Sequence, residues 1–426
     1  MNRAERRRKK KEHSSKEHFQ IALSSVINYL SAGRPKRALQ ILQRELKKTP
    51  SDVTCLHYLG IAKYKIGDIQ GAQTAFNEAI RLEPSYAEAH NSLGNLYLER
   101  TDYENAIHHF EKAVSLNTEY ANAYTNLAEA HQKSGSLELA SQNYSRSIEI
   151  DSSNVRPYYS LATALIGLNR PIEAQELIER CLLIDPWCQN AIAASIIVSQ
   201  MLGDLSGLER LQSFGSFVRP LRIEIPEEYQ TENDFNAALA ANIRREESLS
   251  WEPLNRVTHQ GAVTEDLLNK PTKLIRLFEM SLRSSIDAFL NGLEFDEGHP
   301  FLNRAPKNYT LTFVASILKA GGWHPPHIHE NAWLSGVYYV DIPDFIQNTS
   351  EPVDKSSKLQ SHDISGHIEF GRPNYTLPDG FEPVTYPYQP ESGVALCFPS
   401  YFFHKTVPFA GSGERIGIAF DVYPDS

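Results

Sequence analysis

The chain has 426 residues, of which 41% are hydrophobic and 22% charged, a balance typical of a folded protein rather than a disordered one. This length exceeds what one ordinary core accommodates and indicates two or three domains. A net charge of −10 argues against nucleic acid as a general partner. No apolar run reaches the roughly 18 residues that a bilayer span requires, so we expect no membrane segment.

The N-terminal segment 1–17 is strongly basic, with seven Lys and Arg residues between Arg3 and Lys11. No apolar stretch follows these charges, as it would in a secretory signal. We expect a disordered basic tail and a cytoplasmic protein, with an anionic partner or a targeting address as the alternative role of the tail. The cysteines lack a paired metal spacing and are expected to be free thiols: Cys55, Cys181, Cys188 and Cys397.

The next part of the chain, 18–204, repeats itself every 34 residues. Leu-Gly or Leu-Ala pairs begin at 59, 93, 127 and 161, and alanines recur at 38, 72, 106, 140 and 174. Small residues at fixed positions let paired helices approach closely, and the prolines at 50 and 84 end the second helix of a pair. Gly33, Gly67 and Gly135 are expected at the turns within the pairs.

This pattern resembles the tetratricopeptide repeat, in five units. The resemblance implies an α-solenoid whose concave face holds a protein or peptide. A purely structural role, shaping an assembly or bracing the other domain, is the alternative.

The last part, 205–426, changes character after a proline-containing transition at 217–229. We expect amphipathic helices near 233–246 and 271–292. From Tyr309 onward short strand-forming segments alternate with turns, which predicts an antiparallel β-sandwich or barrel with flanking helices. The polar, Ser-rich segment 344–365 is expected to be a mobile loop near the barrel mouth. The strand-forming segments are 309–321, 333–342, 366–371, 393–399 and 414–423.

Three histidines in the strand region form a candidate metal site. His327 and His329 are two apart, which places both imidazoles on one face of an extended edge. His404, beside another strand, is the candidate third ligand. Three protein ligands on one side of a six-coordinate iron leave positions for a chelating substrate and for dioxygen. His324 is expected to be a surface residue, and no role is assigned to His259, His299, His362 and His367.

The last strand supplies a candidate anion site. In "ERIGIAFDV", Arg415, Gly417, Ala419 and Asp421 share one face, and the apolar residues between them share the other. Small residues leave space above the arginine, and a buried arginine that faces a cavity needs an anion, for which a carboxylate fits best. Tyr339 could add a phenolic hydrogen bond to the same carboxylate.

The segments "HIHENAWLSGVYYV", "GVALCFPSYFFHKTVP" and "ERIGIAF" resemble the iron(II)- and 2-oxoglutarate-dependent dioxygenases of double-stranded β-helix (jelly-roll) fold, over about 217–424. The resemblance implies that His327 and His404 bind Fe(2+). It also implies that Arg415 forms a salt bridge with the distal carboxylate of 2-oxoglutarate and that Tyr339 supports it. The whole chain would then be an α + β multidomain protein, an α-solenoid followed by a jelly-roll with flanking helices.

Residue 329 departs from the family pattern, because most members have Asp or Glu in this slot. The alternative ligand is Glu330, although on a strand it would point to the opposite face. The leading hypothesis is a 2-oxoglutarate- and Fe(II)-dependent dioxygenase that hydroxylates a protein, a peptide or a small molecule. The alternatives are a three-histidine, cupin-like metalloenzyme that does not use 2-oxoglutarate, and a repeat scaffold with an inactive barrel.

Overall fold

A computed structural model describes residues 19–252, 258–347 and 364–425, which divide into two compact units at 164/165. The expected tail 1–17 and most of the expected loop 344–365 lie outside the described residues. Among the helices that are described, none combines the length and the apolar character needed to cross a bilayer.

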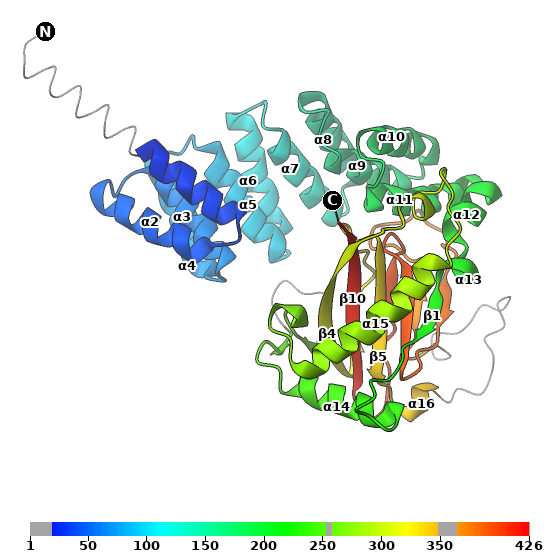
Figure 1. Cartoon of the computed structure of the whole chain (residues 1–426). Coiled ribbons are helices and arrows are strands. Elements are labelled where there is room, and N and C mark those ends of the chain that lie inside the picture. The colour runs from blue at the N-terminus through cyan, green and yellow to red at the C-terminus, as the bar shows by residue number, and fades with distance from the viewer. Residues whose placement is uncertain (1–18, 253–257, 348–363, 426) are drawn as a thin grey trace, which may run out of the picture. The chain divides into compact units, whose positions relative to one another are not determined.

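The first unit is a series of antiparallel helical hairpins (Figure 1). Aspartates cap several of the helices: the side chains of Asp52, Asp68 and Asp102 each accept a hydrogen bond from a backbone N–H in the first turn. The helices are 19–31, α2 (Pro35–Lys48), α3 (Val53–Lys65), α4 (Ile69–Leu82), α5 (Ala87–Glu99), α6 (Tyr103–Leu116), α7 (Ala121–Lys133), α8 (Leu137–Ile150) and α9 (Arg156–Gly167), which runs across the division.

The turns inside these hairpins repeat one backbone conformation. The predicted turn positions at Gly33, Gly67 and Gly135 are confirmed, and each adopts a positive φ. Thr101 and Asn169 adopt the same conformation at the equivalent places, with φ of 58° and 57°. The left-handed residues therefore follow the period of the sequence and extend it to one more position: 33, 67, 101, 135, 169 and 203.

Packing explains why the first helix of a hairpin has a small residue at the repeated position. A Cβ on Gly60 would lie 2.4 Å from Cε1 of Phe76, and a Cβ on Gly94 would lie 2.6 Å from the same atom of Phe110. Both phenylalanine side chains are almost fully buried. The repeated Leu-Gly pairs thus mark where an aromatic ring of the second helix rests against the backbone of the first.

The second unit contains the β-structure. Its helices are α10 (Pro171–Ile184), α11 (Gln189–Leu202), α12 (Leu205–Gln212), α13 (Phe214–Phe217), α14 (Glu232–Arg244), η1 (Leu267–Asn269), α15 (Lys273–Asn291), η2 (Leu302–Arg304) and α16 (Asp344–Gln347). Its strands are β1 (Arg219–Arg222), β2 (Ser250–Trp251), β3 (His259–Val263), β4 (Tyr309–Trp323), β5 (Leu334–Asp341), β6 (Ile368–Phe370), β7 (Tyr386–Tyr388), β8 (Val394–Pro399), β9 (His404–Thr406) and β10 (Arg415–Pro424).

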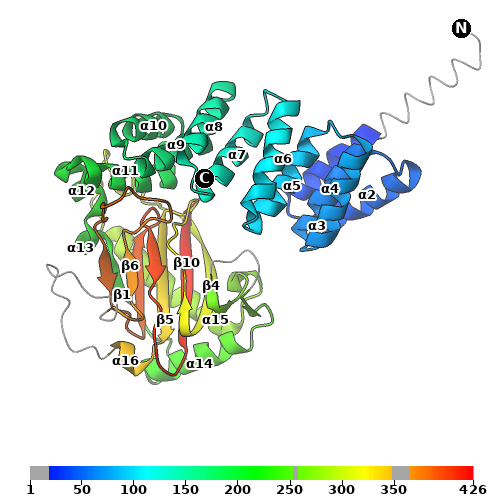
Figure 2. The same ribbon diagram turned by 180° about the vertical axis from the view of Figure 1, so that it is seen from behind.

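The strands form two antiparallel sheets that are consistent with a jelly-roll. The larger has the order β1-β8-β5-β10-β4-β3-β2, and the smaller has the order β7-β6-β9. Helix α15 crosses one face of the larger sheet in Figure 1, and the view from behind in Figure 2 shows β6 in front of the sheet. The predicted solenoid, antiparallel sheet domain and flanking helices are therefore confirmed.

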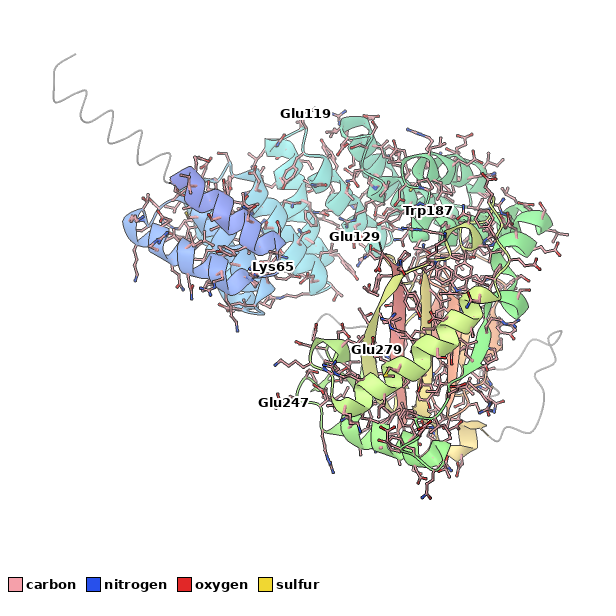
Figure 3. The ribbon with its side chains drawn as sticks, viewed as in Figure 1. Lys65, Glu119, Glu129, Trp187, Glu247 and Glu279 are labelled. Atoms are coloured by element: carbon pink, nitrogen blue, oxygen red, sulfur yellow. The ribbon has the colours of Figure 1, made fainter. Side chains whose placement is uncertain are left out.

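Helix α15 is amphipathic, as its sequence predicts. Its Phe278 packs against Phe313 of β4 and Tyr338 of β5, with ring centroids 5.3 and 5.1 Å apart. On its partly exposed side, Glu279, labelled in Figure 3, accepts a hydrogen bond from Nη2 of Arg283 at 3.2 Å. One face of the larger sheet is thus sealed by this helix, and the opposite face is left to form a cavity.

Helix α11 shares the hydrophobic core of the second unit. Its Ile192, Ala193 and Ile196 belong to the same buried cluster as Phe214 of α13 and the residues of the larger sheet. The sequence placed this helix in the solenoid and the domain boundary after residue 204. In the structure its apolar side chains contribute to the core that supports the β-domain.

Candidate metal centre

Backbone hydrogen bonds bring the three predicted histidines together. The His327 N–H donates to the His404 carbonyl at 3.1 Å, and the His404 N–H donates back at 3.0 Å. The His329 N–H donates to the carbonyl of Ser400 at 3.1 Å. The extended segment after β4 is therefore paired with the segment that enters β9, and one ring nitrogen from each histidine lies within 4.8 Å of the others.

The Nδ1 atom of each ring is occupied by a hydrogen bond to an acceptor outside the cluster. Nδ1 of His327 donates to the Pro325 carbonyl at 2.9 Å, and Nδ1 of His404 donates to the Phe402 carbonyl at 3.0 Å. Nδ1 of His329 donates to Oδ2 of Asp421 at 2.9 Å. These acceptors place the proton on Nδ1, which leaves the Nε2 lone pair of each imidazole free.

Burial keeps two of these rings neutral. Burial, with neighbouring His329 adding to the effect, lowers the pKa of His327 to about 4. It also lowers the pKa of His404 well below its ordinary value, with His327 and His329 adding to the effect. Neutral imidazoles have the lone pairs that metal ions require, so this cluster is chemically suited to hold a cation.

Asp421 is the carboxylate beside the cluster. Besides His329, it accepts hydrogen bonds from Oγ of Ser335 at 2.6 Å and from the Tyr423 hydroxyl at 3.3 Å. Burial alone would raise the pKa of Asp421, but His329 and these hydroxyl groups outweigh burial and hold the pKa below its usual range. The sequence pattern places Asp421 on the inner face of the last strand but predicts no role for it at the metal site. The sequence signal that could have indicated a role for Asp421 is its spacing, because it lies on the same face of the strand as Ala419 and Arg415.

Arg415 lies deep in the same cavity and is only 5% exposed. Its Nη1 donates to the Gly366 carbonyl at 2.8 Å, and its guanidinium lies 5.2 Å from the centroid of the Tyr339 ring. No carboxylate among the described residues lies within ion-pair distance of it. The neighbouring Glu414 forms an ion pair with Arg244 at 3.1 Å. A buried cation without an anionic partner has binding capacity left for a ligand.

Tyr339 is equally buried beside this arginine. Its hydroxyl makes no well-formed hydrogen bond within the part of the chain that the structure describes, although the guanidinium lies next to it. Burial raises the pKa of Tyr339, and the charge of Arg415 acts against that rise. The phenol therefore remains a protonated donor.

The cavity measures about 390 Å³, within the range of small-molecule sites. The predicted inner face of the last strand is confirmed, because Arg415, Gly417, Ala419 and Asp421 all line it. Adjacent β4 contributes the residues paired with them: Leu318, Ser316, Val314 and Thr312. The alternate residues of β10 are buried on the other side of the sheet. Small side chains on β10 thus keep open the space between the histidines and the arginine.

The structure corrects the expectation for His324 and shows where Glu330 lies relative to the three histidines. His324 was expected at the surface, but it lines the cavity, because its carbonyl accepts the Thr406 N–H and its Nδ1 lies 3.2 Å from Oγ1 of that threonine. Burial, with His327 and Arg415 nearby, lowers its pKa to about 3. Glu330 is exposed at the cavity lining, and His329, not Glu330, belongs to the converging group.

Of the histidines to which no role was assigned, His259 stacks on Trp323, and His299 accepts backbone hydrogen bonds from Phe301 and Leu302. His367 is buried, and its Nε2 has no partner among the described residues. His362 lies outside the described residues.

Comparison with known protein families finds a match in each half of the chain. Residues 314–421 match a family described as "Putative 2OG-Fe(II) oxygenase". Residues 58–123, 92–155 and 155–186 match tetratricopeptide repeat families. The chain therefore carries tetratricopeptide repeats followed by a C-terminal domain of this oxygenase type.

No curated protein matches the chain. Among solved structures, MamA is 26% identical, with 37% of this chain and 93% of MamA covered and a TM-score of 0.34. YrrB, described as a TPR protein with an unusual peptide-binding site, is 18% identical over 39% of this chain and 89% of its own, with a TM-score of 0.36. PilF of Pseudomonas aeruginosa is 16% identical over 46% and 93%, with a TM-score of 0.42.

Proposed function

We propose that the chain is an iron(II)- and 2-oxoglutarate-dependent dioxygenase whose repeat module binds a protein or peptide. The observation that carries the proposal is one cavity that joins three histidines with free Nε2 atoms to a buried arginine without a carboxylate partner among the described residues. The first group suits a divalent metal, and the second suits an anion that reaches the metal from the far side.

The donor set fits iron(II). His327, His329 and His404 would hold the ion through Nε2, each with Nδ1 already fixed by a hydrogen bond. Such outer bonds orient metal-binding histidines and make them better ligands. Three nitrogen ligands on one side leave coordination positions for other groups, as non-haem iron oxygenases need.

Arg415 and Tyr339 would hold the remote carboxylate of the cosubstrate. The guanidinium offers a planar pair of donors that matches a carboxylate, and the Tyr339 hydroxyl supplies a further donor beside it. Both groups are buried, so a bound carboxylate would give the guanidinium an anionic partner and would satisfy the Tyr339 hydroxyl, which has no hydrogen-bond partner among the described residues. This gives a reason to prefer a dicarboxylate that chelates the metal at one end and meets Arg415 at the other.

Bound iron would supply the oxidising chemistry: dioxygen converts 2-oxoglutarate to succinate and carbon dioxide, and one oxygen atom enters a C–H bond of the substrate as a hydroxyl group. The side chains of this chain orient the cosubstrate and limit access of water. Phe398 packs against His404, with ring centroids 4.6 Å apart, and shields one side of the cluster. The substrate would enter from the side where Glu330 and Asn331 line the cavity.

A protein or peptide is the substrate class that the domain combination favours, because tetratricopeptide repeats commonly bind polypeptide segments. The cavity itself would also admit a small molecule. A three-histidine enzyme that does not use 2-oxoglutarate is the second candidate. The observation in its favour is that the cluster, among the described residues, consists of three histidines and contains no carboxylate ligand. In that case Arg415 would bind the substrate's own carboxylate.

Succinate formation separates these candidates. The full chain is incubated with iron(II), dioxygen and 2-oxoglutarate, and succinate is measured beside binding of 2-oxoglutarate to the iron-loaded protein without oxygen. We expect both signals in the wild type, and we expect both to be lost in His404→Ala. Iron binding without binding of 2-oxoglutarate would favour the second candidate, and absence of iron binding would overturn both.

A further inference from the structure

Asp421 differs from the other partners of the histidine rings. His327 and His404 donate their Nδ1 protons to neutral backbone carbonyls, whereas His329 donates to a carboxylate, with nitrogen-oxygen distances of 2.9 Å to Oδ2 and 2.7 Å to Oδ1. This ring is also at the position where most of the resembling oxygenases have an acidic ligand. His329 is therefore the ring of this cluster whose Nδ1 is hydrogen-bonded to an anion.

The carboxylate is held firmly from its other sides. Ser335 donates to Oδ1 at 2.6 Å, and its hydroxyl lies 2.8 Å from that of Ser400, whose carbonyl accepts the His329 N–H. The hydrogen bonds that Asp421 makes with His329, Ser335 and Tyr423 are all donated to it, an arrangement that suits the ionised form. The same network fixes both the side chain and the backbone of residue 329.

We propose that Asp421 takes the place of the missing acidic ligand, supplying its negative charge to the metal centre through the ring of His329. It is a positioning residue that acts through His329 and does not touch the metal. The inference rests on the proposed metal site at the three histidines. In this proposal His329 supplies the ligand atom and Asp421 the negative charge, which a single aspartate or glutamate supplies in most of the resembling oxygenases.

Charge balance gives the physical reason. Iron(II) and Arg415 together carry three positive charges, which three neutral imidazoles do not offset. Asp421 offsets one of them, and a dianionic 2-oxo dicarboxylate offsets the other two. Without Asp421 the cavity would retain an uncompensated charge in a region with little solvent, where charge is costly. The carboxylate also makes the His329 nitrogen more electron-rich through its hydrogen bond.

A double-mutant cycle tests this role without measuring activity. Affinity for iron(II) is measured without oxygen, by competition with a chromogenic chelator, in the wild type, Asp421→Asn, His329→Asp and the double variant. Asp421→Asn keeps the size of the side chain and a hydrogen-bond acceptor but removes the charge. We expect it to weaken iron binding about 10- to 100-fold in the wild-type background.

In the His329→Asp background the same change is expected to leave iron binding unchanged or to strengthen it. The reason is that two adjacent carboxylates repel each other and only one is then needed. Asp341→Asn is the matched control, because it removes an exposed carboxylate from the end of β5 and should not alter iron binding. Ser335→Ala, which removes a hydrogen bond to Asp421 but no charge, should weaken binding several-fold, and it serves as the test if Asp421→Asn does not fold.

The outcomes separate this inference from the proposed function. If the wild type binds no iron, the proposed function fails and this inference fails with it. If the wild type binds iron and Asp421→Asn binds it equally well, only the role of Asp421 is refuted. An equal loss in both backgrounds would also refute it, because a merely structural role of Asp421 would not depend on the residue at 329.

Discussion

His327 and His404 exchange two backbone hydrogen bonds, at 3.1 and 3.0 Å, and their rings lie with centroids 4.3 Å apart. This pairing does not depend on either side chain, so the backbone itself sets the spacing of two predicted ligands. The cluster is therefore preorganised, and a metal would not have to draw the strands together.

It follows that removing one imidazole should remove the metal but not the fold. His404→Ala is expected to weaken iron(II) binding more than about 100-fold, because it deletes one of three ligands, whereas loss of an outer partner costs about 10- to 100-fold. Iron content after anaerobic reconstitution measures the effect, and circular dichroism checks the fold. His108→Ala, an exposed histidine of the first unit, is the control. Full iron occupancy in His404→Ala would refute the predicted ligand set.

Arg415 should govern binding of the cosubstrate and leave the metal alone. In Arg415→Ala the carboxylate of 2-oxoglutarate would lose a buried, charged hydrogen-bond partner, a loss of about 3 kcal/mol, or on the order of 100-fold in Kd. Calorimetry of 2-oxoglutarate binding to the iron-loaded protein without oxygen tests this. Arg244→Ala removes a surface arginine whose partner is Glu414 and should have no effect. Equal affinities in Arg415→Ala and the wild type would exclude the arginine from the carboxylate site.

The stability of the first unit should depend on pH through His57. Burial lowers the pKa of its ring from 6.5 to about 4, so the folded state keeps it neutral where the unfolded state binds a proton. Stability is therefore fully present above pH 6.5 and is lost as the pH falls toward 4. Protonation of His57 in the unfolded state should lower the free energy of unfolding by about 2 kcal/mol between pH 8 and pH 5.

Urea unfolding of the full chain at several pH values tests the role of His57. His57→Gln retains hydrogen-bonding capacity toward Ser92, the partner of the His57 ring at 2.8 Å, but cannot titrate in this range. The variant should show a smaller loss of stability between pH 8 and pH 5 than the wild type. An unchanged pH dependence in this variant would assign the effect to other groups.

The packing of α11 predicts where the chain can be divided. Ile192 and Ile196 are almost fully buried in the core of the second unit, and each contributes about 1.5–3 kcal/mol by burial. A fragment of residues 165–426 should therefore be more stable than one of residues 205–426, by up to several kcal/mol. Thermal unfolding of both fragments measures the difference. Equal stability would favour the boundary after 204 that the sequence pattern suggests.

Much of the fold follows from short-range patterns. The period of 34 residues predicts the hairpins because the small residues and the turn residues serve the same local contacts in every unit, as Gly94 and Phe110 illustrate. The helix expected at 271–292 forms at Lys273–Asn291, since its buried residues recur at helical spacing. Strands β4, β5, β8 and β10 fall within one or two residues of the expected segments, because alternation or continuous apolar character marks them.

The remainder depends on contacts that no short segment encodes. Strand β9 has three residues, one of them His404, and its partner β6 is also short, so neither periodicity nor length marks it. Strand β3 has exposed residues at one end and was not expected at all. His324 was placed at the surface because its cover comes from Thr406, 82 positions away in the chain. The role proposed for Asp421 likewise depends on a partner 92 positions away.

Anaerobic titration of the full chain with iron(II) and then 2-oxoglutarate, followed by visible absorption, tests the central claim most directly. We expect one iron per chain and a weak charge-transfer band when 2-oxoglutarate is added, with the band lost in both Arg415→Ala and His404→Ala. Absence of iron binding, or a band of full strength in both variants, would contradict a centre built from the three histidines and the buried arginine.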